Sequence, residues 1–247
     1  DALRMRDEFK CGEGLQKPNL EEDDIENLLI QQIEFCNIIV LNKVSEVSAD
    51  ELGRLKAIIR TLQPNAAIIE CDYCDFDLDR IIGTGMFDFD EVAGSAAWIE
   101  EIEDRHEEHH HHDHDELENE EEGEADEYGI GTFVYYRRQP MNLGLFDEFV
   151  ARHWPKGVIR AKGMVYFTEE YDNCYLFEQA GKQVKMSDAG RWFAPMPKED
   201  LKRTMAHDPH LRADWDDYYG DRMQKLVFIG QHLDKEAITA ALDKCLE

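Results

Sequence analysis

Apolar residues recur with helical and strand spacing over the first 98 residues. After a cluster of acidic residues, apolar positions follow at three- and four-residue intervals over residues 25–36, which predicts an amphipathic helix. The β-branched run at residues 38–41 predicts a buried parallel strand. Ser48 and Glu51 have the spacing of a capping box that opens a second helix, and residues 66–70 predict a second strand. This alternation predicts an α/β fold, a partial doubly wound parallel sheet.

The pattern changes after residue 128, where short strands outnumber helices. We expect helices over residues 143–152 and from residue 234 onward, and strands over residues 132–136, 158–168, 174–179, 183–186 and 226–230. Strands clustered with two or three helices predict a small α+β domain with a mainly antiparallel sheet.

A charged low-complexity segment separates these two patterns. Residues 100–127 hold sixteen carboxylates and one Arg, a large part of the formal net charge of -28. Such a segment is too polar to bury a core, so we expect a disordered linker. The sequence therefore predicts three regions: residues 1–98 as half of a doubly wound α/β sheet, 99–127 as a His-rich acidic linker, and 128–247 as a carboxy-terminal α+β domain.

Composition restricts the partners and the compartment. Hydrophobic residues make up 43% of the chain, enough for packed cores, yet no apolar run reaches 18 residues and no signal-like segment opens the chain. The strong negative charge argues against nucleic acid and anionic membrane as partners. Six scattered cysteines fit a reducing compartment, so we expect a cytoplasmic protein; a homo-oligomer is left open.

Asn42, Lys43 and Ser45 follow the first predicted strand and form a candidate nucleotide-binding site. Ligands of open α/β sheets bind at the carboxyl ends of strands. An Asn amide can bond a purine edge, and a Lys stem can lie on the ring face. Ser45 stands where GTPases place an Asp that accepts two hydrogen bonds from guanine, so we expect a loss of roughly 1.5–3 kcal/mol in base selectivity. Without further context, a strand end turning into a loop is the better interpretation of these residues.

Imidazoles are concentrated in the acidic segment. Neutral imidazole suits Zn²⁺, Ni²⁺ and Cu²⁺, and the neighbouring carboxylates could complete a ligand shell. The alternative is a solvating linker in which the histidines are incidental. We favour metal binding, with the candidate ligands being His106, His109, His110, His111, His112 and His114.

Other segments carry weaker signals. Cys71 and Cys74 are half of a four-thiolate site, but two small residues at a strand end are the better interpretation, because the nearby carboxylates oppose thiolate formation. Arg160 and Lys162 alternate along a strand and should share one face, as an anion or partner site or as solvated charges, with Gly163 permitting close backbone approach. His207 and His210 are expected on the surface, and Trp192 and Trp215 in a core or interface.

The order of these segments resembles the CobW-type metal-handling GTPases over essentially the whole chain. The resemblance is carried by residues 31–43 (QQIEFCNIIVLNK), 54–69 (RLKAIIRTLQPNAAII), the linker, VIRAKG, RWF and KLVFIGQHLD. It implies a GTPase that delivers zinc, or cobalt or nickel, to a client metalloprotein. Asn42 and Lys43 match the guanine-recognition motif of the family, whereas Ser45 departs from it.

The resemblance also implies parts that these 247 residues do not contain. Neither a G-x-x-x-x-G-K-[ST] phosphate loop nor a C-x-C-C motif occurs in the sequence. GTP and Mg²⁺ are therefore expected to bind only together with a preceding amino-terminal half, and we expect the chain alone to lack GTPase activity, with no catalytic residue of its own. Two alternatives are a non-catalytic metal-buffering or partner-docking protein and an acidic adaptor without a metal role.

Overall fold

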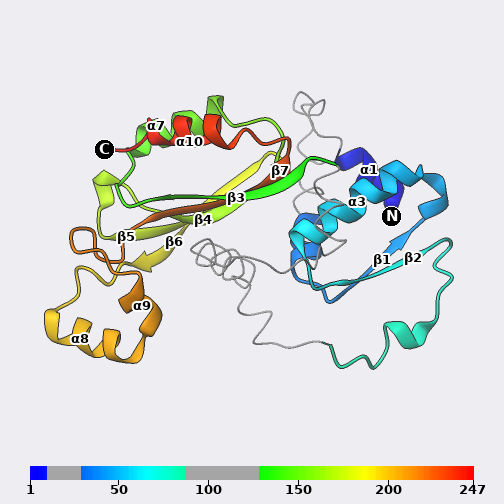
Figure 1. The fold of residues 1–247 in the computed structure, drawn as a ribbon, viewed down its shortest axis with the longest axis horizontal. Coiled ribbons are helices and arrows are strands. Elements are labelled where there is room, and N and C mark those ends of the chain that lie inside the picture. The colour runs from blue at the N-terminus through cyan, green and yellow to red at the C-terminus, as the bar shows by residue number, and fades with distance from the viewer. Residues whose placement is uncertain (10–28, 87–127) are drawn as a thin grey trace, which may run out of the picture. The chain divides into compact units, whose positions relative to one another are not determined.

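The computed structural model describes residues 1–9, 29–86 and 128–247, which belong to two compact units (Figure 1). Most residues of the strands that lie between residues 130 and 231 belong to the second unit. The first unit comprises Asp1–Thr132, Ala180–Gln183 and Ile229–His232, and the second comprises Phe133–Gln179, Val184–Phe228 and Leu233–Glu247.

The first unit contains the α/β elements expected from the sequence. Its two strands pair in parallel, with Ile38 opposite Ala67 and Asn42 opposite Cys71. Both strands therefore end at the same edge. The elements are α1 (Ala2–Glu8), β1 (Ile38–Asn42), η1 (Val44–Glu46), α3 (Ala49–Leu62), β2 (Ala67–Cys71) and η2 (Leu78–Arg80).

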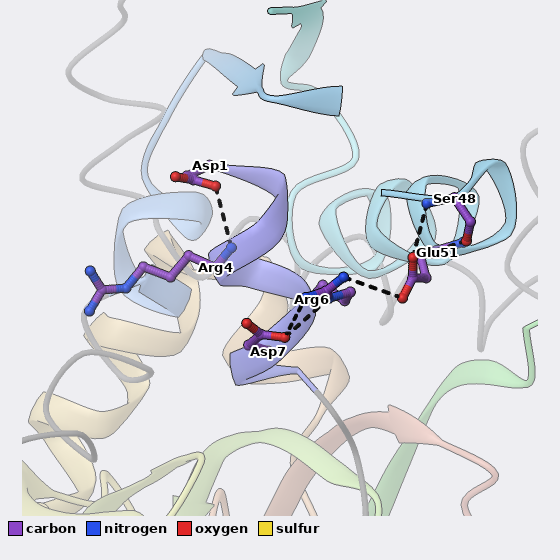
Figure 2. Close-up of polar contacts among 6 residues, drawn as sticks. All are labelled: Asp1, Arg4, Arg6, Asp7, Ser48 and Glu51. Atoms are coloured by element: carbon purple, nitrogen blue, oxygen red, sulfur yellow. Dashed lines mark hydrogen bonds and ion pairs between the residues drawn. The ribbon is translucent and has the colours of Figure 1, made fainter. Parts of the chain in front are cut away.

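Local capping fixes where the helices of this unit begin. The Ser48 hydroxyl accepts a hydrogen bond from the amide of Glu51 at 3.2 Å, and the Glu51 carboxylate accepts one from the amide of Ser48 at 2.9 Å, which confirms the predicted capping box. Asp1 caps α1 by accepting from the amide of Arg4. Figure 2 shows these caps and the ion pair of 3.8 Å that joins Arg6 of α1 to Glu51 of α3.

A separate five-stranded antiparallel sheet forms the body of residues 128–247. Its spatial order is β3-β7-β4-β5-β6, so the last strand in the sequence lies between β3 and β4. The connection from β3 through α7 to β4 therefore skips one position. The strands are β3 (Ile130–Arg137), β4 (Val158–Val165), β5 (Asn173–Ala180), β6 (Gln183–Arg191) and β7 (Gln224–Gln231).

Helices α7 (Leu143–Arg152) and α10 (Lys235–Asp243) lie on one side of this sheet (Figure 1). They bury Phe146 and Leu242 in a core with residues of the sheet, among them Phe228. Phe133 and Phe228 stack with ring centroids 5.0 Å apart. A smaller buried cluster is formed by Tyr166, Cys174, Trp192 and Met223, which places Trp192 in a core as expected.

Strand β4 is buried along most of its length. A β-carbon added at Gly163 would overlap the carbonyl oxygen of Lys225 and lie 2.8 Å from the Cα of Leu226, so glycine there lets β7 approach. The expected close approach is confirmed. Arg160 and Lys162 both contact the Glu178 carboxylate, at 3.3 and 3.5 Å, and therefore share a face.

Three helices of the described ranges were not predicted from the sequence. These are α1, α8 (Lys198–His207) and the short α9 (Pro209–Ala213). Helix α8 buries no residue fully, and Leu201 and Met205 are only half-buried. Two apolar positions are too few for the sequence pattern to indicate a helix. The expected fold class, a parallel α/β part followed by an antiparallel α+β part, is confirmed.

No helix in the described ranges is long and apolar enough to cross a membrane. The linker expected over residues 99–127 lies outside the described residues, so the three-region division remains a prediction.

Candidate nucleotide-base site

Asn42 ends β1 and binds the loop that follows β2. Its Oδ1 accepts a hydrogen bond from the backbone amide of Cys74 at 3.1 Å, and its Nδ2 donates to the Cys74 sulfur at 3.2 Å. The Cys71 thiol also donates to Asn42 Oδ1, at 3.7 Å. Because parallel strands end at one edge, residues 32 positions apart in sequence meet here. Asn42 thus fixes the loop on which any ligand at this edge would rest.

Ser45 forms two hydrogen bonds with the Asp72 side chain. Its backbone amide and its hydroxyl both donate to Oδ1 of Asp72, at 3.1 and 2.8 Å. The position that lacks a carboxylate in the sequence motif therefore lies against a carboxylate from the neighbouring strand end. Asp72 is partly exposed, so it remains accessible to a ligand.

Lys43 lies between these two residues with its backbone in the left-handed region, at a φ of 62°. Its ammonium forms an ion pair of 2.7 Å with Asp1. Both side chains are more than a third exposed, so this pair contributes at most about 1 kcal/mol to stability. The pair holds the end of the Lys43 side chain and leaves its aliphatic stem available for stacking.

Backbone strain is concentrated at this edge. Four non-glycine residues in the described ranges have positive φ, and three of them are Lys43, Tyr73 and Cys74, at 62°, 55° and 57°. Such conformations are uncommon for residues with a side chain and persist where the surroundings hold them. Tyr73 is 94% exposed, so its ring contributes little to the core. This clustering marks the edge as a candidate site.

The thiols at this edge do not combine with other described residues into a group that could hold a metal ion. Burial raises the pKa of the Cys71 thiol, and the carboxylates of Asp72 and Asp75 raise it further, so Cys71 stays protonated at neutral pH. Across residues 1–9, 29–86 and 128–247, no group of three or more His, Cys, Asp or Glu could hold a metal ion. This supports the interpretation of the two cysteines as small residues at a strand end.

The remaining predicted residues belong to the second unit or lie outside the described ranges. The candidate metal ligands belong to the second case: His106, His109, His110, His111, His112 and His114. Arg160 is 3% exposed and donates to Glu178 and to the carbonyl of Gln179, so it is not a solvated charge. His207 is exposed at the end of α8 and contacts the carbonyl of Arg203, as a surface residue rather than a ligand.

Asp72 is the residue that the sequence argument missed at this edge. In the sequence it stands only as one of the carboxylates that disfavour a thiolate at Cys71. Its position directly after the second predicted strand was a usable signal, because two parallel strands bring their carboxyl ends together.

Comparison with known families agrees with this arrangement. Residues 7–70 match the family described as the CobW/HypB/UreG nucleotide-binding domain, and residues 130–246 match the cobalamin synthesis protein cobW C-terminal domain. The two matches together cover more than half of the chain, in the order expected from the sequence. The chain therefore belongs to the CobW-type proteins.

Among individual proteins, the chain is similar to zinc-regulated GTPase metalloprotein activator 1 of Dictyostelium discoideum, with 26% identity over 259 residues. The match includes the whole chain and 50% of that protein, so the chain spans about half the length of its relative. Among solved structures it is similar to Zn(II)-bound YjiA GTPase from E. coli and to a Zn(II)-bound triple mutant of YjiA, with 16% identity, 92% of this chain and 57% of those chains covered, and TM-scores of 0.36 and 0.34.

Proposed function

We propose that this chain supplies base recognition and metal capture to a GTP-dependent metallochaperone, a protein that binds a transition metal and delivers it to a client metalloprotein. Zinc is the first expected cargo, with cobalt and nickel as alternatives. The observation that carries the proposal is the position of Asn42 and Lys43 at the shared carboxyl edge of β1 and β2, in a chain of the CobW type.

The nucleotide role is supported by chemistry at that edge. The Asn42 side-chain nitrogen carries two N–H groups, and one of them donates to Cys74. The second can donate to a purine, and the Lys43 stem offers an apolar surface to its ring. Asn42 already orders the loop after β2, so the site is partly organised before a ligand arrives. When GTP and Mg²⁺ are bound, the metal neutralises phosphate charge, and the residues at this edge would hold the base.

The metal role is supported by the six linker histidines. Imidazole nitrogen is a common ligand for zinc and nickel, and several interchangeable imidazoles favour capture and release over permanent storage. The printed name of the Dictyostelium relative describes it as zinc-regulated, which places zinc first among the metals to test.

Zinc titration by calorimetry tests the metal role. The chain is compared with a variant in which His106, His109–His112 and His114 are replaced by Ser. A matched control replaces His153 and His207, which are both exposed, by Ser. We expect the parent and the control to bind zinc with a Kd of about 1 μM or tighter, and the linker variant to lose at least one such site.

Equal zinc binding by the parent and the linker variant would show that the linker histidines are not the zinc ligands. Zinc binding without any nucleoside binding at the β1–β2 edge would favour a metal-buffering protein instead. The nucleoside measurement described below separates these two functions.

A further inference from the structure

We propose that Asp72, held in place by Ser45, is the carboxylate that selects guanine at the edge formed by β1 and β2. The assignment rests on the proposed function, because it names the group that distinguishes bases in that site.

The carboxylate of Asp72 is fixed, but only half of it is used. A carboxylate offers about four acceptor positions, two on each oxygen. Both donors of Ser45 bind Oδ1, with the amide at 3.1 Å and the hydroxyl at 2.8 Å. Oδ2 has no hydrogen-bond partner among the described residues. Asp72 therefore presents one oriented, unused acceptor oxygen.

The loop that carries Asp72 is held by contacts of Asn42 with the residues on either side of it, Cys71 and Cys74. Cys71 pairs with Asn42 in the parallel register, and the amide of Cys74 donates to Asn42 Oδ1 at 3.1 Å. Asp72 lies between these two anchors and is itself bound to Ser45, three residues beyond Asn42. Anchors on both sides reduce the entropy that the carboxylate would lose on binding a ligand.

The chemistry of an unused carboxylate oxygen favours guanine over adenine. Guanine presents two adjacent donors, the N1–H and the 2-amino group, and one oxygen can accept from both. Adenine presents an unprotonated N1 on the same edge and carries no amino group at C2. A carboxylate only accepts, so it attracts the first edge and repels the second. A serine hydroxyl both donates and accepts, so Ser45 alone would discriminate poorly between the two bases.

The structure thus gives Ser45 and Asp72 different roles. Ser45 is a positioning residue, and Asp72 is the specificity-determining residue. The carboxylate that the sequence motif lacks at position 45 is supplied from the end of the neighbouring strand. On this assignment, the chain retains guanine selectivity despite the serine.

The test is a comparison of guanosine and adenosine binding by the full 247-residue chain. Binding through a base alone is weak, with a Kd on the order of 1 mM, so amide shifts of residues 42–45 and 71–74 are followed by NMR. The parent should prefer guanosine. Asp72→Asn keeps an oxygen for Ser45 and puts an NH₂ group where Oδ2 was, so the ratio of guanosine to adenosine affinity should fall at least about tenfold.

Two further variants control for charge and for folding. Asp75→Asn makes the same charge change at an exposed carboxylate three residues away and should leave the ratio unchanged. The double variant Ser45→Asp with Asp72→Ser exchanges the carboxylate and the hydroxyl, and it should restore the guanosine preference. If Asp72→Asn does not fold, Asp72→Ser decides: a lost guanosine preference supports the assignment and a retained one overturns it.

The outcomes separate this assignment from the proposed function. If Asn42→Ala abolishes guanosine binding while Asp72→Asn leaves the ratio unchanged, Asp72 only joins two loops, and the base site stands without it. If the parent binds neither nucleoside, the β1–β2 edge does not select guanine in this chain, and the assignment of Asp72 is overturned.

Discussion

The β1–β2 edge and the five-stranded sheet use polar residues in opposite ways. At the edge, Asp72 is partly exposed and keeps an acceptor oxygen without a partner in the described residues. In the sheet domain, charged groups are tied to one another: Arg160 and Lys162 share Glu178, and Asp243 binds both Tyr135 and Arg137.

This difference separates polar groups that stabilise the fold from polar groups that are available for binding. A buried charge must be paired, because desolvation without a partner costs several kcal/mol. Arg160 at 3% exposure is such a case. An exposed acceptor has no such requirement, since water or a ligand can bind it. The contrast predicts that changes in the sheet affect stability, whereas changes at the edge affect binding.

The largest effect is expected from Gly163→Ala. The new β-carbon would overlap the carbonyl of Lys225, so β4 and β7 must separate, and the free energy of unfolding should fall by about 3 kcal/mol. Urea denaturation measures the loss. Gly131→Ala is the matched control, because nothing lies within 4 Å of the added carbon; equal stability of the two variants would show that β7 does not need this close approach.

A smaller loss is expected from Glu178→Ala. It removes a carboxylate that pairs with buried Arg160, and we expect a loss of about 2 kcal/mol in urea denaturation. Glu148→Ala removes the partner of Arg152 from an exposed pair within α7 and should cost less than about 0.5 kcal/mol. Similar losses of unfolding free energy in the two variants would show that the buried and the exposed ion pair contribute equally to stability.

Ser45→Ala addresses the edge. It removes the hydroxyl that donates to Asp72 but keeps the backbone donor, so guanosine affinity should fall about threefold, while the free energy of unfolding changes by less than about 0.5 kcal/mol. NMR titration and urea denaturation measure the two quantities. Ser187→Ala, a hydroxyl deletion in β6, should change neither. A large loss of unfolding free energy with unchanged guanosine affinity would show that Ser45 stabilises the fold, as Glu178 does in the sheet, and does not contribute to binding.

The smallest effect is expected at Lys225, where burial lowers the pKa to about 8 from an ordinary value of 10.5. The protonated form is disfavoured in the folded state, so its cost is fully present below about pH 8 and disappears as the pH rises toward 10.5. Lys225→Met should be more stable than the parent at pH 7, by less than about 1 kcal/mol after solvent screening.

Urea midpoints at pH 7 and pH 10 test this expectation. The advantage of Lys225→Met should shrink at the higher pH, because the parent lysine is then largely neutral in the folded state. An advantage that stays constant would mean that the charge of Lys225 is not what costs stability.

Much of the fold was predictable because its signals are local. The capping box at Ser48 sets the start of α3, and the apolar spacing of residues 143–152 gives α7 with its observed bounds. Strands β1 and β2 lie within one residue of their expected positions. Helix α8 was missed because it buries no residue fully, so propensity and an acidic first turn were its only signals.

Half of the candidate base site was also predictable. Asn42 and Lys43 were identified from their position after a strand and from the family resemblance. The partner of Ser45 was not, because Asp72 lies 27 residues away and nothing in the intervening sequence specifies which side chain faces the hydroxyl. The role of the linker histidines remains a prediction, since they lie outside the described residues.

The sequence by itself determined the order of the strands, the two kinds of sheet and the residue types available at each strand end. These depend on propensities, caps and periodicity, which act over a few residues. Only the tertiary structure decided that β7 lies between β3 and β4, that Glu178 pairs with Arg160, and that Asp72 binds Ser45. Strand pairing joins distant segments, and the pairing alone determines which side chains meet at an edge.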